Sequence, residues 1–135
     1  MIKRSLIIGR WYVEIYFADD GFDSDTILDR MYDFGISVQD MRRALEIMES
    51  GEPNKGFTAF NPIEHLAVIA IGPTTSGAEF QDTVVHEIHH MAVIIASSLG
   101  IDLEGETPAY LSGDSMRDVA DVVCRLGCDR CREDV

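Results

Sequence analysis

The sequence predicts an α+β fold in which a small, mainly antiparallel sheet of three or four strands packs against helices. Apolar and polar side chains alternate over residues 10–17, as in a half-buried strand, and residues 65–71 form a short β-branched run typical of a buried strand. Other segments have apolar residues at helical spacing, and the longest covers residues 78–99. Because the chain has 135 residues, 46% of them hydrophobic, we expect one domain over residues 1–135.

Two short helices are expected after the first strand. Apolar residues recur at helical spacing from Ile27 to Tyr32, and Gly35 stands where that helix ends. Ser37 can cap a second helix, which Gly51 terminates. These helices separate the first predicted strand from the others.

The second half of the chain is predicted to be mainly helical. Residues 57–60 add a short strand, and the long helix over residues 78–99 follows a segment rich in glycine, proline and threonine. A last helix is expected from near Glu106 to about Leu126, since Pro108 is tolerated only in a first helical turn.

Charge and hydropathy exclude two classes of partner. Asp and Glu number 24 against 11 Lys and Arg, which gives a formal net charge of -13, so we expect repulsion of phosphates and no nucleic acid partner. Gly9 and Arg10 interrupt the short N-terminal apolar run, which predicts no signal peptide. The longest other apolar stretch, residues 91–96, is too short to span a bilayer, so no membrane partner is expected.

Three cysteines, Cys124, Cys128 and Cys131, crowd the end of the chain. Disulfide-stapled secreted domains do not distribute cysteines in this way, so we expect a reducing, cytoplasmic compartment. The cysteines could form a structural zinc site, although a fourth ligand is missing, or could share a zinc ion or a disulfide between two chains. We prefer a third interpretation, incidental cysteines in a frayed tail over residues 127–135.

Residues 86–90 read His-Glu-Ile-His-His and contain the His-Glu-x-x-His signature of zinc peptidases. Residues four apart in a helix lie on one face, about 6 Å along the axis, so the imidazoles of His86 and His90 can bind one ion. Glu87 is then placed to take a proton from water during attack on a carbonyl. Apolar residues around the motif predict a helix embedded in the core, where polar side chains need partners such as a metal.

A catalytic zinc ion usually has three protein ligands and one open position, so a further ligand is required. Glu106 is the preferred candidate because it comes sixteen residues after His90, across a short turn, at the start of the last helix. Glu104 is an alternative, since a loop residue can reach inward.

In this arrangement the chain resembles the gluzincin class of zinc metallopeptidases, whose third ligand is a glutamate on the helix after the signature helix. The resemblance covers residues 84–111 and includes a small sheet ahead of the signature helix, and the same segments are similar to small uncharacterised proteins of phages and mobile elements. It implies a zincin-like fold with a central signature helix. Gluzincins place an aspartate four residues after the glutamate ligand, where this chain has Tyr110. Asp114, one turn further on, is expected to orient a ligand instead, and Tyr110 is a candidate for stabilising an oxyanion.

Several alternatives stay open for the motif. His89 could replace His90 by pairing with His86, but Glu87 would then be less well placed, so we expect His89 to be exposed. Glu87 and His90 also form the Glu-x-x-His half of a di-iron site, whose second copy is missing from the chain. Iron or manganese could occupy a site of two histidines and one carboxylate, although the signature favours zinc. An amphipathic helix that displays these residues to solvent, without a metal, is the simplest alternative.

We therefore predict a minimal zinc-dependent hydrolase that acts on a peptide or protein substrate. Zn²⁺ would be held by His86, His90 and Glu106, with Glu87 as the general base and then the general acid. The competing interpretation is a non-catalytic zinc-binding, zincin-like module that acts through protein–protein interaction. A metal-free interaction protein is the third.

Overall fold

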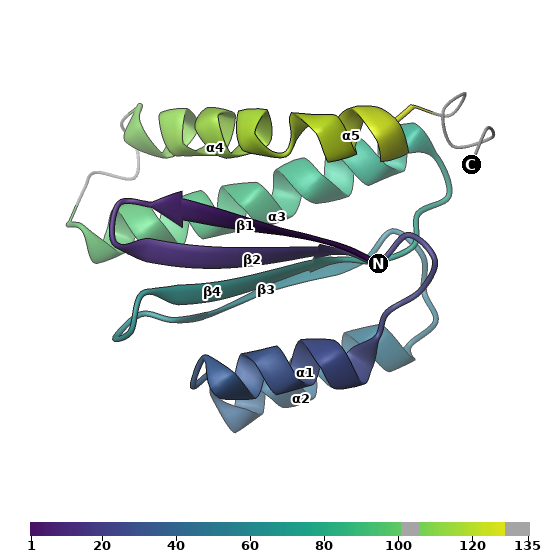
Figure 1. The fold of residues 1–135 in the computed structure, drawn as a ribbon, viewed down its shortest axis with the longest axis horizontal. Helices are drawn as coiled ribbons and strands as arrows, with labels where there is room; N and C mark the ends of the chain where they lie inside the picture. The colour runs from purple at the N-terminus through teal and green to yellow at the C-terminus, as the bar shows by residue number, and fades with distance from the viewer. Residues whose placement is uncertain (101–105, 129–135) are drawn as a thin grey trace.

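The computed structural model describes residues 1–100 and 106–128 of the chain, and within these ranges it contains a four-stranded sheet and five helices (Figure 1). The elements in chain order are β1 (Ile2–Ile8), β2 (Trp11–Phe17), α1 (Ser24–Asp33), α2 (Val38–Glu49), β3 (Gly56–Asn61), β4 (Leu66–Ile71), α3 (Gly77–Ser98), α4 (Thr107–Asp118) and α5 (Ala120–Leu126). The α+β class is confirmed. The predicted last helix is instead two helices, which are separated at Val119, where the backbone leaves helical geometry with φ −110° and ψ 12°.

The sheet is mixed, with strand order β1-β2-β4-β3. Its outer pairings, β1 with β2 and β3 with β4, are antiparallel, but β2 and β4 are parallel. Parallel neighbours need a long crossover, which α1, α2 and β3 supply here. Strand β1 was not predicted from the sequence, and it pairs with β2 along its full length through a tight turn at Gly9 and Arg10. Gly9 adopts φ +59°, as this kind of turn requires.

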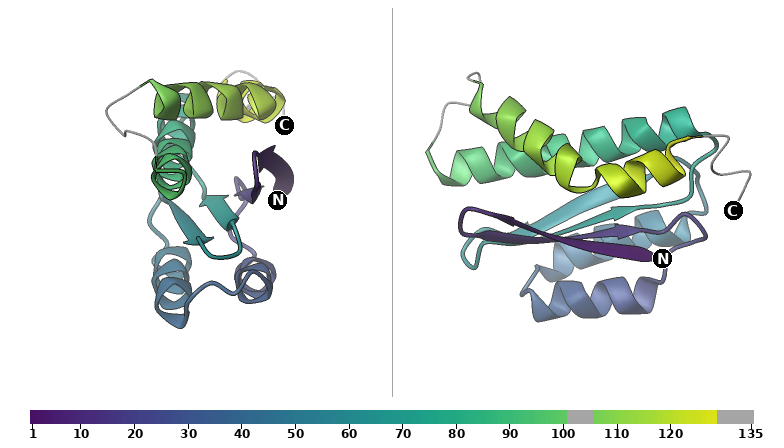
Figure 2. Two further views of the ribbon diagram at one scale, coloured as in Figure 1. Left: turned by 90° about the vertical axis from the view of Figure 1, so that its left-hand side faces the viewer. Right: turned by 45° about the horizontal axis from the view of Figure 1, so that its top comes forward.

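The sheet, and not α3, is the central layer. Helices α1 and α2 cover one face, while α3, α4 and α5 cover the other (Figures 1 and 2). Helix α3 contacts β3 and β4 directly and is contacted in turn by α4 and α5. In the described part of the chain, no helix has the length and apolar character needed to cross a membrane.

A separate apolar core lies on each face of the sheet, because side chains along a strand alternate between the two faces. On the α3 face, Val13, Ile15 and Ile69 pack against Ile88 and other residues of the helices. On the other face, the core consists of residues from the sheet and from helices α1 and α2 and the segment that joins them, namely Tyr16, Ile27, Met31, Phe34, Ile36, Ala44, Phe57, Ala59, Val68 and Ala70. Both faces of the sheet are therefore covered, and its exposed parts are its edges.

One ionised side chain, Glu14 of β2, is fully buried beside this second core. Arg30 of α1 donates to both of its carboxylate oxygens at 2.9 Å, and the Lys3 ammonium lies 3.0 Å away. The hydroxyls of Tyr12 and Tyr16 complete its hydrogen bonds. Burial raises the pKa of Glu14, but the hydrogen bonds from these four partners outweigh it and hold the pKa at about 2, below the ordinary 4.5.

Substitution of Glu14 is expected to destabilise the fold in a pH-dependent way. At neutral pH, Glu14→Gln should lower the free energy of unfolding by about 3 kcal/mol, because it leaves Arg30 without its partner. A lowered pKa gives stability that is complete above pH 4.5 and is lost as the pH falls towards 2. Urea denaturation at pH 7 and pH 3 should therefore show a smaller difference between wild type and variant at pH 3. Glu49→Gln, at an exposed position in α2, is the control, and an equal effect of both substitutions would contradict this account.

Candidate metal centre

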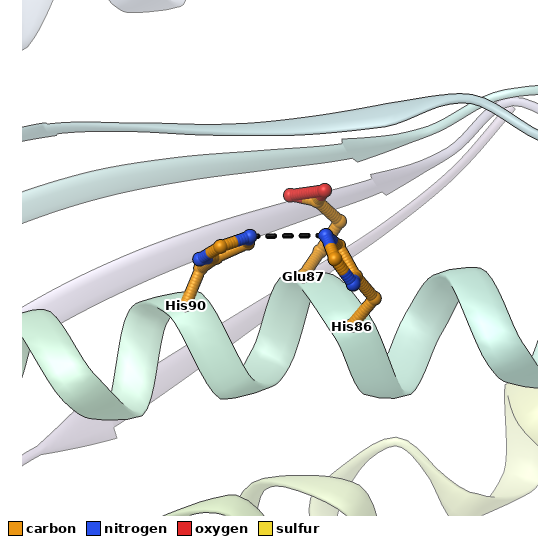
Figure 3. Close-up of side chains that lie close together, drawn as sticks. All are labelled: His86, Glu87 and His90. Carbon is orange, nitrogen blue, oxygen red and sulfur yellow. Dashed lines mark hydrogen bonds between the residues drawn. The ribbon is translucent and has the colours of Figure 1, made fainter.

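Helix α3 brings the signature residues to the edge of the sheet. The Ser76 side chain caps the helix by accepting a hydrogen bond from the Glu79 amide at 3.1 Å. Ile88 and Met91, on one face of the helix, are buried in the core, whereas His86 and His90 lie on another face and are exposed. The signature helix is thus embedded on one side only. In Figure 3 the three signature side chains lie on the side of α3 that faces the strands, away from the yellow-green helices.

The two imidazoles converge. Their Nε2 atoms are 3.0 Å apart, and their ring centroids lie 4.6 Å apart with the rings nearly perpendicular. Two histidine nitrogens that bind one tetrahedral zinc ion at about 2.05 Å are separated by about 3.3 Å. The observed separation is close to this value, and the hydrogen bond joins the two Nε2 atoms that would both bind the metal (Figure 3). The pair therefore fits two ligands of one ion.

Glu87 adds a carboxylate to the pair. One of its oxygens and the two histidine nitrogens all lie within 4.8 Å of one another, which makes the three residues a group that could hold a metal ion. Only 6% of Glu87 is exposed. The Thr58 hydroxyl of β3 donates to Glu87 Oε2 at 2.8 Å, whereas no described residue donates a hydrogen bond to Oε1. Oε1 is therefore available to a ligand or to water.

Gly56 of β3 makes room for this carboxylate. A Cβ atom at this position would lie 2.7 Å from the Ala70 carbonyl oxygen and 3.2 Å from both Glu87 Cγ and Thr83 Cγ2. The missing side chain thus lets α3 approach the sheet closely at the point where Glu87 enters the interface. Neither Gly56 nor Thr58 was identified from the sequence, because their contacts with Glu87 depend on how β3 packs against α3.

Loss of the Thr58 hydroxyl is expected to destabilise this interface. Thr58→Val keeps the shape of the side chain but leaves the buried carboxylate without its donor, which should lower the free energy of unfolding by about 2 kcal/mol. Thr58→Ser keeps the donor and removes one methyl group, so a loss of about 0.8 kcal/mol is expected. Chemical denaturation of both variants measures the difference. A valine variant as stable as the serine variant would show that this hydrogen bond contributes nothing.

The remaining predicted residues lie elsewhere. Glu106 is exposed at the start of α4, accepts a hydrogen bond from the Tyr110 hydroxyl at 3.3 Å, and is not part of the cluster of ligand atoms. Asp114 pairs with Arg117 at 3.2 Å, also outside the cluster. The role of Glu106 as third ligand stays a prediction that the structure does not support. His89 is exposed, as expected.

Two other predictions fall wholly or partly on parts of the chain that are not described. Glu104, the alternative third ligand, lies outside the described residues, and so does Cys131. Cys124, in α5, is exposed, and Cys128 is half-buried. The interpretation of the cysteines therefore stays a prediction, as does the frayed tail, of which only residues 127 and 128 are described.

Comparisons with known protein families, with curated proteins and with solved structures find no match. The chemistry of the site therefore follows from its own residues. They form a candidate metal centre of two histidines and one carboxylate on one helix, next to an edge strand. This donor set suits zinc, and it also suits iron or manganese.

Proposed function

We propose that the protein is a zinc-dependent hydrolase that cleaves peptide bonds. The observation that carries the proposal is the convergence of His86 Nε2 and His90 Nε2 with the largely buried carboxylate of Glu87. Two converging imidazoles and a carboxylate with one oxygen available combine a metal-binding pair with a proton acceptor.

Each residue has a distinct role in this proposal. His86 and His90 hold the zinc ion through their Nε2 lone pairs. When bound, zinc lowers the pKa of water and polarises a carbonyl group. Glu87 accepts a proton from the attacking water through Oε1 and delivers it to the leaving amine, while Thr58 holds Oε2 in place.

The surroundings of the cluster suit an extended substrate. Strand β3 is an edge of the sheet, and α2 and α3 contact it from opposite faces. A hollow of about 580 Å³ lies between these elements and is lined by His86 and Glu87. An edge strand next to a hollow of this kind can receive an extended peptide chain.

The test starts from untagged wild-type protein. One zinc ion per chain is expected by elemental analysis, together with cleavage of a peptide library that stops when a chelator removes the metal and returns when zinc is restored. Protein that takes up no zinc on titration would overturn the proposal. In the same titration, Glu106→Ala decides the third ligand: a loss of affinity would establish Glu106, and unchanged affinity would exclude it.

A non-catalytic zinc site is a second candidate, and one observation favours it. In the described residues, Glu87 is the only carboxylate grouped with the two histidines, so it could serve as the third ligand and not as the base. The ion would then be bound by three residues of α3, and it would stabilise the fold or contribute to the binding of a protein partner. If the zinc site is non-catalytic, the protein should bind zinc and cleave no peptide.

A further inference from the structure

Two hollows adjoin the cluster, one on each side of Glu87. The first, of about 580 Å³, extends along His86, and the second, of about 350 Å³, extends along His90. Both are lined by residues of α2, β3 and α3, and they share Ile47, Gly56 and Glu87. The carboxylate of Glu87 therefore stands at the boundary between two spaces with different linings.

The hollow beside His86 is acidic. Its lining includes Glu46 of α2 and Asp82 of α3, both exposed, and among the described residues no side chain forms an ion pair or hydrogen bond with either carboxylate. The lining has one basic residue, Lys55, whose ammonium lies 3.6 Å from the carboxylate of Glu52. The unpaired charge in this hollow is thus negative, from one carboxylate on α2 and one on α3.

The hollow beside His90 is mainly apolar. Ile47, Phe60 and Ile94 line it, each only partly buried. The charged group at its wall besides Glu87 is Arg43, whose guanidinium donates to the Thr58 carbonyl at 3.3 Å. This space offers contact to a large apolar side chain and little to a small polar one.

We infer that the site selects peptides with a basic side chain on one side of the cleaved bond and a large apolar side chain on the other. The basic side chain enters the acidic hollow between Glu46 and Asp82, and the apolar side chain contacts Phe60 and Ile94. This inference rests on the proposed function. The two exposed carboxylates make the lysine preference electrostatic, so it weakens as ionic strength rises.

Four quenched fluorescent peptides test the inference, identical except for a central Lys-Phe, Phe-Lys, Gln-Phe or Phe-Gln pair. One lysine peptide should be cleaved with a kcat/KM at least about tenfold above that of its glutamine counterpart, since two exposed ion pairs contribute about this much. The double variant Glu46→Gln/Asp82→Asn should bring this ratio to about 1 and leave the glutamine peptides within about threefold of wild type. Glu49→Gln/Glu79→Gln is the matched control, on the same two helices but outside both hollows. An unchanged ratio in the first double variant would overturn the inference.

A binding measurement separates this inference from the proposed function. If wild-type protein cleaves none of the four peptides, the proposed function fails, and the same peptides with a fluorescent label are tested for binding by anisotropy. Tighter binding of a lysine peptide that the Glu46→Gln/Asp82→Asn variant loses would support the two-sided groove without catalysis. Equal binding of lysine and glutamine peptides, or no binding, would overturn it. Ile94→Ala tests the apolar side. It should lower the ratio of kcat/KM between the preferred lysine peptide and a counterpart in which alanine replaces phenylalanine.

Discussion

Glu87→Gln is expected to lower kcat/KM for a cleaved peptide by about 1,000-fold, the contribution of a positioned general base. Zinc affinity should stay within about threefold of wild type, because the proposed ligands are the two histidines. The amide has the shape of the carboxylate, and its oxygen can still accept the hydrogen bond from Thr58. The packing around Glu87 is therefore kept while the proton acceptor is removed.

Glu79→Gln is the matched control for this experiment. It makes the same change on the same helix, at an exposed position outside both hollows, and full activity is expected. Loss of zinc from the Glu87→Gln protein would mean that Glu87 is a ligand, as the non-catalytic candidate requires. If the Glu87→Gln protein retains zinc and turns over substrate at the wild-type rate, Glu87 is not the general base.

The parts of the fold that the sequence predicts are those with a local pattern. Alternation identified β2, and helical spacing with end signals located α1, α2 and α3 closely. Strand β1 was missed, because residues 2–8 show basic residues followed by a short apolar run, and their conformation depends on pairing with β2. The parallel register of β2 and β4 was equally inaccessible, since it depends on the path of some fifty intervening residues.

In the candidate site, too, local features could be predicted from the sequence and tertiary contacts could not. The spacing of His86 and His90 is a property of one helix, so their convergence follows from sequence alone. Glu106 was chosen from its distance along the chain, but α3 continues for eight residues beyond His90, about 12 Å, before the chain turns back. The start of α4 lies near the C-terminal end of α3 (Figure 1), whereas His90 lies eight residues before that end. Thr58 of β3 and Glu46 of α2 precede the signature helix in the chain. They come near Glu87 only when the chain is folded, so their positions in the sequence do not indicate a part in the site.

His90→Ala is expected to weaken zinc binding by at least about 100-fold, because it removes one of two converging imidazoles and leaves a site with a single histidine. His89→Ala should change the affinity by less than about threefold, since the His89 side chain is exposed and is not part of the cluster. Competition with a chromophoric chelator at pH 7.5 measures both affinities, and zinc should raise the melting temperature of wild type and of His89→Ala but not of His90→Ala.

The comparison of these adjacent histidines is sharp because both changes remove an imidazole from the same helix turn. Any general effect of histidine loss on charge or helix stability is common to the two variants, so a difference between them reports the position of the side chain. Equal weakening would show that binding involves His89 and contradict the geometry in which only His86 and His90 converge. Loss of zinc in the His90 variant alone would establish the four-residue spacing of His86 and His90 as the metal-binding feature of the helix.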